Sequence, residues 1–258
     1  MIALTHLPSP ALERGQRTHL DRAPIDFPKA LQQHADYCRA LRECGVEVRI
    51  LDANHHLPDS VFVEDTAIVL EEIAILASMG TASRREELPA IETELKKYRP
   101  TVRIQLPATI EGGDVLRVDQ KIIVGLSRRT NAAGIDELKS IVRQFDYEII
   151  SVAVGDCLHL KTGCSALPDG SLLVNEAWVA AESLRDFHLI RIPPTEPWAA
   201  NVLSIGGDVV TPAGHPATTK LIREMGFRVR PVDLSEFAKA EGGATCLSIL
   251  LNEPRATE

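Results

Sequence analysis

The chain has 258 residues, a formal net charge of −8 and a pI of about 5.5, with 45% hydrophobic and 25% charged residues. This composition is ordinary for a soluble globular protein, and the length suits one large domain or two small ones. An acidic balance disfavours nucleic acid as a partner because phosphate backbones carry the same sign. No run approaches the ~20 apolar residues of a membrane span, and no basic stretch leads into an apolar one, so neither a membrane span nor a signal peptide is expected.

The first predicted elements form an incomplete unit. A strand is expected at Met1–Thr5, a helix at Leu31–Cys44 and a strand at Val46–Leu51. The helix prediction rests on Tyr37, Leu41 and Cys44, whose spacing places them on one face. A hairpin partner for the first strand is missing from this part of the chain.

Four complete units follow, each about 45 residues long. Each begins with two short apolar strands around a polar or Gly/Pro-rich turn: Thr66–Ala77, Asp114–Leu126, Thr162–Asn175 and Asn201–Ala213. Apolar residues at helical spacing come next, although the helix around Trp178–Leu184 is short. A further strand closes each unit: Val102–Leu106, Glu148–Val152, Leu189–Ile192 and Arg228–Val232.

The C-terminal run Thr245–Leu251 is an apolar strand with no helix after it. Pairing it with the first strand would complete a fifth unit and close the array into a ring, which removes exposed sheet edges. The alternative is an ordinary α/β sheet whose spacings are coincidental. The repeat favours the closed ring.

Polar residues occupy equivalent places at the starts of the inner strands. They recur every 42 to 48 residues along the chain: Glu64 with Asp65, Glu111, His159, Asn201 and Cys246. In a closed ring, such positions converge on the central axis. Two carboxylates, a histidine and a cysteine would then meet, and this is a coherent set for nucleophilic catalysis with acid–base assistance.

Arginines recur as well, on the loops that lead into the helices. Arg84 follows Asp65 by 19 residues, and Arg129 follows Glu111 by 18. A carboxylate pair suits a cationic guanidinium, whereas arginines suit a carboxylate. The pattern therefore predicts an arginine-like ligand with a cation at one end and a carboxylate at the other.

The cysteines differ in what they suggest. Their odd number and the lack of a CxxC pair argue against a disulfide framework or a structural zinc site, so a reducing cytoplasm is expected. Cys38, Cys44 and Cys164 are interpreted as buried hydrophobic residues, and Cys157 is left undecided. Cys246 is favoured as the nucleophile because the preceding Gly242-Gly243 predicts a close backbone approach.

At these residues the chain resembles the dimethylarginine dimethylaminohydrolases, in the pentein superfamily that includes arginine deiminase. The matching motifs run nearly the whole length, in order: LPDSVFVEDTAIV (57–69), GTASRREE (80–87), EGGDVL (111–116), VGLSRRTN (124–131), LHLKTGCS (158–165), AANV (199–202) and GGATCLSILLN (242–252). The resemblance implies a single domain, 1–258, folded as a five-bladed α/β propeller with pseudo-fivefold symmetry.

The resemblance also implies roles for individual residues. Cys246 would attack the guanidinium carbon of a methylated arginine, and His159, partnered by Glu111, would act as acid and then as base. Citrulline and an alkylamine would be the products, with no metal or cofactor. Glu64 and Asp65 would bind the guanidinium group of the substrate. Asp59 would bind its α-amino group, and Arg84 and Arg129 would bind its α-carboxylate.

One segment departs from the family pattern. The family covers its substrate with an N-terminal loop that usually carries a leucine, and the ungapped match here is Arg17, within ERGQRTHL. A cation at this point puts the choice of substrate in doubt, and Arg17 is kept as a substrate-binding candidate. For partners we expect a small guanidine compound, neither nucleic acid nor membrane, and we allow for a homodimer.

Three other functions compete with methylarginine hydrolysis. The first is deimination of free arginine or another guanidine by the same chemistry, which the FVED motif disfavours. The second is a non-catalytic propeller like that of a ribosome-associated factor, against which Cys246 and His159 argue. A papain-like protease is the third, and it would leave Asp65, Arg84 and Arg129 without a use.

Overall fold

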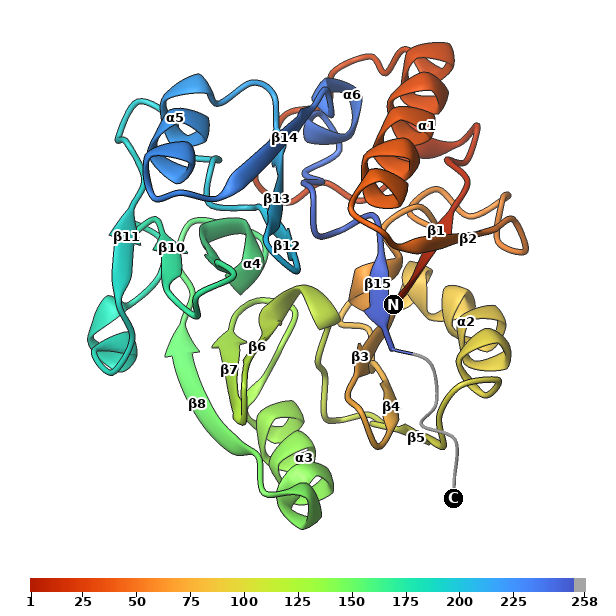
Figure 1. Cartoon of the computed structure of the whole chain (residues 1–258). Helices are drawn as coiled ribbons and strands as arrows, with labels where there is room; N and C mark the ends of the chain where they lie inside the picture. The colour runs from red at the N-terminus through yellow and green to blue at the C-terminus, as the bar shows by residue number, and fades with distance from the viewer. Residues whose placement is uncertain (253–258) are drawn as a thin grey trace.

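Five three-stranded sheets make up the β-structure of residues 1–252, the part of the chain that the computed structural model describes (Figure 1). In each sheet the central strand pairs antiparallel with one neighbour and parallel with the other. The first sheet has the order β15-β1-β2 and thus unites the two ends of the chain. The C-terminal strand pairs with the first strand, Ile2 opposite Leu251, as the sequence predicted.

The strands follow the predicted repeat closely. The first sheet contains β1 (Ile2–His6), β2 (Glu47–Leu51) and β15 (Ile249–Leu251). The other four each take three consecutive strands: β3 (Ala67–Val69), β4 (Ala74–Leu76) and β5 (Thr101–Arg103); β6 (Val115–Val118), β7 (Lys121–Leu126) and β8 (Glu148–Ala153); β9 (Cys164–Ala166), β10 (Leu172–Val174) and β11 (Leu189–Arg191); β12 (Leu203–Ile205), β13 (Asp208–Pro212) and β14 (Arg228–Val232).

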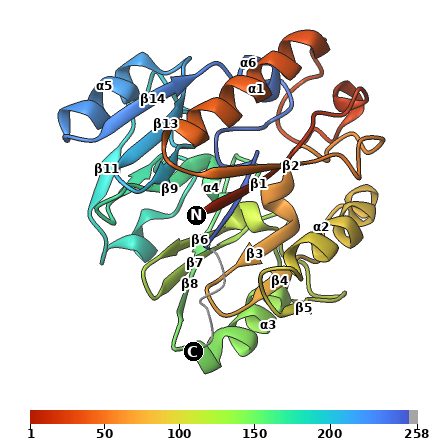
Figure 2. The ribbon, with the colours of Figure 1, turned by 45° about the vertical axis from the view of Figure 1, so that its right-hand side comes forward.

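Four longer helices lie at the outside of the molecule, with the strands toward its middle (Figures 1 and 2). They are α1 (Phe27–Glu43), α2 (Leu88–Leu95), α3 (Ala132–Val142) and α5 (Pro216–Glu224). Short helices connect the remaining elements: η1 (Leu12–Arg14), η2 (Val63–Thr66), η3 (Ala82–Glu87), η4 (Gly112–Asp114), η5 (Arg143–Phe145), η6 (Ala181–Leu184), α4 (Leu160–Gly163) and α6 (Ser235–Ala238). The short helices η2, η4 and α4 directly precede inner strands, and they carry or adjoin the candidate site residues.

Buried apolar side chains join each sheet to its neighbours. Within residues 1–252, five clusters link successive sheets, and one of them links the last sheet to the first. Representative members of that cluster are Ala3 and Tyr37 on one side and Val210, Val232 and Phe237 on the other. The packing therefore supports every sheet from both flanks.

Four predicted elements differ from the structure, and one of them is the strand predicted at Val102–Leu106, which ends at Arg103. Helix α1 begins at Phe27, four residues before the predicted start, because Asp26 caps it by accepting from the Lys29 N–H and Pro28 favours the first turn. The helix predicted at 178–184 shrinks to η6, since Val179 pairs with Val154 in an isolated β-bridge. The last strand covers only Ile249–Leu251, which leaves Cys246 in a turn before it.

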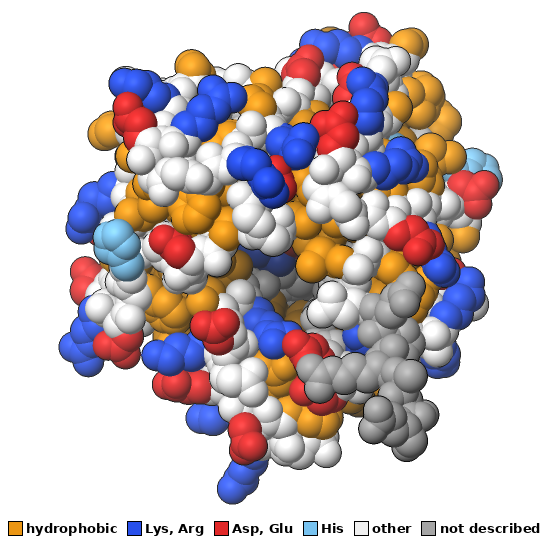
Figure 3. All heavy atoms as spheres, viewed as in Figure 1, with side chains coloured by type: hydrophobic (Ala, Val, Ile, Leu, Met, Phe, Trp, Pro, Cys, Tyr) orange, Lys and Arg blue, Asp and Glu red, His pale blue; other side chains and the backbone are white. Residues whose placement is uncertain are grey.

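The molecule is hollowed near its centre in the space-filling view (Figure 3). The inner strands line a cavity of about 460 Å³ that reaches Glu64, Lys161 and Thr245. Among the described residues, no helix is both long and apolar enough to cross a membrane.

Candidate active site

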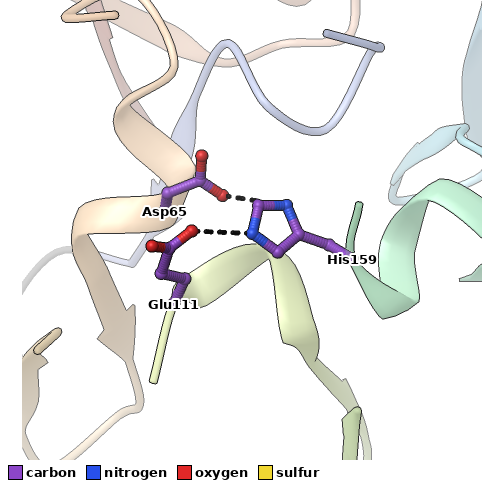
Figure 4. Close-up of side chains that lie close together, drawn as sticks. All are labelled: Asp65, Glu111 and His159. Carbon is purple, nitrogen blue, oxygen red and sulfur yellow. Dashed lines mark hydrogen bonds and ion pairs between the residues drawn. The ribbon is translucent and has the colours of Figure 1, made fainter. Parts of the chain in front are cut away.

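His159 faces two carboxylates from different units of the repeat (Figure 4). Its Nε2 is 2.8 Å from Glu111 Oε2, and its Nδ1 is 3.6 Å from Asp65 Oδ1. Asp65 belongs to η2, whereas Glu111 and His159 immediately precede η4 and α4. Three of the predicted site residues are thus in contact, although 94 positions separate the outer two in the sequence.

The close approach of these groups depends on Gly113. A Cβ atom at this position would lie 2.6 Å from both Asp65 Oδ1 and His159 Nδ1, so a side chain here would separate the pair. The glycine in the EGGD motif is therefore a packing requirement of the site.

The charge state of His159 follows from these neighbours. Burial alone would lower its pKa, but Asp65, Asp114 and Glu111 raise the pKa to about 9. The imidazole is therefore protonated at neutral pH and can donate a proton to a leaving group.

Asp114 is a member of this cluster to which the sequence assigned no role. It accepts hydrogen bonds from the Leu160 N–H at 2.8 Å and the Ser127 hydroxyl at 2.6 Å, and it is fully buried. Since Leu160 follows His159 directly, Asp114 fixes the backbone that carries the imidazole. Its appearance in EGGD, three residues after Glu111, was the available signal.

One oxygen of Asp65 accepts a hydrogen bond, and the other faces His159 without accepting one. Its Oδ2 is 2.5 Å from Arg84 Nη1, while its Oδ1 is buried and has no hydrogen-bond partner within the described chain. Burial disfavours ionisation, but His159 and Arg84 hold the pKa of Asp65 below its ordinary value. A buried, ionised oxygen without a donor is the group that a cationic ligand would satisfy.

Arg84 is held by protein groups throughout its guanidinium. The Glu87 carboxylate accepts hydrogen bonds from Arg84 Nε at 3.0 Å and from Arg84 Nη2 at 2.8 Å. The Phe62 carbonyl accepts another hydrogen bond from Nη2 at 3.0 Å. Together with the Asp65 contact, these bonds occupy most of the five N–H donors. The structure thus places Arg84 beside Asp65, with limited capacity left for a ligand carboxylate. Glu87, three residues after Arg84 on η3, was missed by sequence reasoning.

Cys246 is tied to the same region through its backbone and its thiol. Its carbonyl accepts a hydrogen bond from the Glu64 N–H at 3.2 Å, and its Sγ accepts a hydrogen bond from the Gly243 N–H at 3.3 Å. The predicted close approach at the glycine pair is confirmed, since a Cβ on Gly243 would lie 2.3 Å from Asn201 Oδ1. Cys246 and Cys44 are both partly exposed, so the prediction of a buried Cys44 is wrong because this residue lies just past the end of α1, whereas Cys38, Cys157 and Cys164 are buried.

The thiol of Cys246 is neutral in the free protein. Burial, with the carboxylates of Glu64 and Asp65 nearby, raises its pKa to about 12. We therefore expect Cys246 to react slowly with iodoacetamide at pH 7, more slowly than free cysteine, with a rate still rising at pH 9, since the thiolate is the reactive form. The measurement is mass spectrometry of the Cys246 peptide over a pH series. A rate that reached its plateau below pH 8 would contradict the assigned proton state.

Glu64 has a different environment from its neighbour Asp65. Its Oε1 is 2.5 Å from Lys161 Nζ, and its Oε2 accepts from the Thr245 hydroxyl at 2.7 Å. Burial raises the pKa of Glu64 despite these partners. Both oxygens are therefore engaged by protein groups at the border of the central cavity. Lys161, two residues after His159 on α4, was not identified from the sequence.

The remaining predicted residues lie where the segment Gln16–Leu20 crosses the site. The Gln16 N–H donates a hydrogen bond shared by the two carboxylate oxygens of Asp59, at 3.0 Å to Oδ1 and 3.2 Å to Oδ2. Arg129 Nη2 donates a hydrogen bond to the Thr18 hydroxyl at 3.1 Å. Arg129 Nη1 is also 3.6 Å from Glu111 Oε1. Arg17 turns to the Lys239 carbonyl, to which its Nε donates at 2.8 Å. Asp59 and Arg129 thus border the site, whereas Arg17 is bound to the loop before Cys246.

Three of the central side chains carry atoms of the kind that ligate metal ions. Ligand atoms of Asp65, Glu111 and His159 all lie within 4.8 Å of one another. The protonated state of His159 and its bond to Glu111 oppose metal ligation, because a ligating imidazole must be neutral. The arrangement suits proton transfer beside a nucleophile.

Known proteins resemble this chain over most of its length. Residues 16–162 match the family model described as "N,N dimethylarginine dimethylhydrolase, eukaryotic". The N(G),N(G)-dimethylarginine dimethylaminohydrolase of Pseudomonas aeruginosa is 38% identical over 87% of this chain and 89% of the relative. The enzyme of that name from Streptomyces coelicolor is 36% identical over 97% of each chain.

A solved structure extends the likeness to three dimensions. A mutant of the Pseudomonas aeruginosa enzyme, in which serine replaces a cysteine, is complexed with citrulline and superposes with a TM-score of 0.91. The sequence identity is 35%, and the match covers 96% of this chain and 97% of the other. The chain therefore belongs to the dimethylarginine dimethylaminohydrolase family.

Proposed function

We propose that the protein hydrolyses Nω-methylated arginine to citrulline and an alkylamine, with Cys246 as the nucleophile. The observation that carries the proposal is the Asp65 oxygen that accepts no hydrogen bond, buried beside a protonated His159 and adjacent to the Glu64 backbone that holds Cys246. A guanidinium fits there because its planar N–H groups supply the missing hydrogen-bond donors. Family membership and the citrulline complex of a relative support the same reaction class.

The first half of the reaction forms a covalent intermediate. A bound guanidinium adds positive charge near Cys246 and so lowers the pKa of its thiol, which releases its proton to water. The thiolate then forms a bond to the central guanidinium carbon. His159 gives its proton to the methylated nitrogen, the carbon–nitrogen bond breaks, and the alkylamine leaves neutral.

The second half returns the enzyme to its starting state. His159, now neutral, takes a proton from water, and the resulting hydroxide adds to the carbon of the thiouronium cation. The carbon–sulfur bond then breaks with its electron pair on sulfur, and the proton given up as citrulline forms passes to the thiolate, which restores the neutral thiol of Cys246. Glu111 accepts a hydrogen bond from His159 and stabilises its cationic form in both halves.

Substrate contacts are assigned with the sequence and the site geometry together. Asp65 would bind the guanidinium, Asp59 the α-amino group and Arg129 the α-carboxylate, with Arg84 mainly orienting Asp65. Glu64, paired with Lys161, would help to hold Cys246 in place through its backbone N–H. Arg17 would fasten the segment that covers the site to the Lys239 carbonyl. No metal or cofactor takes part in these steps.

The architecture is proposed to be one domain. We infer a closed five-bladed α/β propeller with pseudo-fivefold symmetry, because β15 pairs with β1 and a core cluster joins the last sheet to the first. A homodimer and a cytoplasmic location stay predictions from the sequence.

The substrate class is tested by comparing arginine with its mono- and dimethylated forms. All three would give the same thiouronium on Cys246 and differ only in the amine released, so preference is decided in the first half-reaction. We expect citrulline with methylamine or dimethylamine, at a kcat/KM at least about tenfold above that for arginine, a difference of roughly 1.4 kcal/mol. Ammonia from arginine at an equal or greater kcat/KM would assign the protein as a deiminase instead.

A further inference from the structure

We propose that Glu241 is a positioning residue that latches a cover loop, residues 16–20, over the active site. This inference rests on the proposed function, because it concerns access to the same site. Neither the motif pattern nor the catalytic steps above assign a role to Glu241.

The cover loop contacts four of the five units of the fold. Gln16 donates from its N–H to Asp59 and from its side chain to Ser83 Oγ at 2.9 Å. Thr18 accepts from Arg129, and Arg17 donates to the Lys239 carbonyl. These partners follow β2, β4, β7 and β14, so the loop spans the end of the molecule where the candidate site residues lie.

Glu241 supplies the densest set of these contacts. Its carboxylate accepts from three successive backbone N–H groups, with distances of 2.9 Å to Thr18, 2.5 Å to His19 and 2.7 Å to Leu20. Three converging donors form a concave anion site, and bonds to an ionised carboxylate are about twice as strong as neutral ones. Residues 16–20 form no helix or strand, so their backbone N–H groups have no partners in regular secondary structure. The Glu241 carboxylate accepts hydrogen bonds from three of these N–H groups instead.

The backbone of Glu241 indicates that its position is specific. It is 9% exposed and adopts a φ of 61°, a left-handed conformation that is unfavourable for a side chain of this kind. This conformation lies immediately before Gly242-Gly243, whose second residue donates to the Cys246 thiol. One short segment therefore holds both the cover loop and the nucleophile.

A second anchor connects the loop to the catalytic carboxylate. Arg129 donates to the Thr18 hydroxyl and lies 3.6 Å from Glu111 Oε1. Thr18 is thus fixed from two sides, through its N–H by Glu241 and through its hydroxyl by Arg129. A substrate that enters or a product that leaves must wait for this loop to open, and Glu241 would be the main group that slows the opening.

Opening of the loop can be measured by limited proteolysis, because trypsin can cut after Arg14, Arg17 and Arg22. We expect Glu241→Ala to speed cleavage at Arg17 by about tenfold or more, and Glu241→Gln by less, because one amide oxygen still accepts. Glu13→Gln is the matched control: it removes one charge from an exposed carboxylate just before the loop and should cleave like wild type. Thermal unfolding of each variant verifies that cleavage occurs in folded protein.

Kinetics give the second readout. With methylarginine as substrate, Glu241→Ala should raise KM about tenfold while kcat falls by less than about threefold, since the latch acts on the loop and not on the reacting atoms. Glu241→Asp should restore part of the protection from trypsin. A folded Glu241→Ala variant with wild-type cleavage at Arg17 would overturn the latch even if turnover is normal. Loss of all activity in wild type would instead refute the proposed function and leave the proteolysis test intact.

Discussion

Replacing Cys246 by serine should lower the rate of citrulline formation by at least about 10⁴-fold, the scale of loss seen when a covalent nucleophile is removed. The serine hydroxyl is a weak nucleophile, and the histidine of this site cannot activate it as a base because His159 is already protonated at neutral pH. Binding should persist, since the carboxylates that face the guanidinium are unchanged. The measurement combines steady-state turnover with calorimetric binding of methylarginine.

The control for this variant is Cys44→Ser. Cys44 is the other cysteine of intermediate exposure and lies at the end of α1, in the cluster that joins the first and last sheets. It should retain near wild-type kcat and KM. Turnover by Cys246→Ser within tenfold of wild type would remove Cys246 from the mechanism, whatever the behaviour of the control.

The second large effect is expected for Asp65→Asn. Asp65 pairs with His159 and Arg84 and has one buried oxygen without a hydrogen bond, so the substitution removes the charge that faces both partners and the bound guanidinium. Loss of one member of a desolvated charge pair costs roughly 2–5 kcal/mol, or about 30-fold to several thousand-fold in kcat/KM. Because alignment with Cys246 suffers too, we expect kcat to carry much of the loss.

The pH profile separates this role from a purely structural one. Asp65 is the first of the carboxylates that raise the pKa of His159 to about 9 against the opposing effect of burial. Without that charge the pKa falls, the protonated acid is lost at lower pH, and the alkaline limb of kcat should shift downward. Asp59→Asn, at the other end of the site, should raise KM without moving this limb. An unshifted limb in Asp65→Asn would show that Asp65 does not control His159.

Most of the fold could be predicted because each unit repeats the same local signals. Alternating apolar strands, a polar turn and a helical stripe recur at nearly constant spacing, and every sheet contains the predicted strands. The exceptions arose where tertiary contacts override local preference. Val179 pairs with Val154 across the chain, and the turn that holds Cys246 is set by Glu64 and Asn201.

The site was predicted unevenly for a related reason. The repeat places Asp65, Glu111 and His159 at equivalent positions, and their contact follows from the fold. The groups that hold Arg84, Glu64 and the cover loop come from outside the repeat pattern, so Glu87, Lys161 and Glu241 were not found. Arg84 illustrates the limit: its position in the sequence suggested a ligand for the substrate carboxylate, but only the structure reveals that Glu87 and Asp65 already neutralise it.

The proposed mechanism is tested most directly by detecting the covalent intermediate on Cys246. Wild-type protein is mixed with dimethylarginine, quenched with acid within one turnover, digested and analysed by mass spectrometry. We expect an adduct on the peptide that contains Cys246, heavier by the mass of citrulline less one water, with dimethylamine released in equal amount. The same adduct should form from monomethylarginine. Citrulline formation without any adduct on this peptide, or with the adduct on another cysteine, would contradict the assignment of Cys246 as the nucleophile.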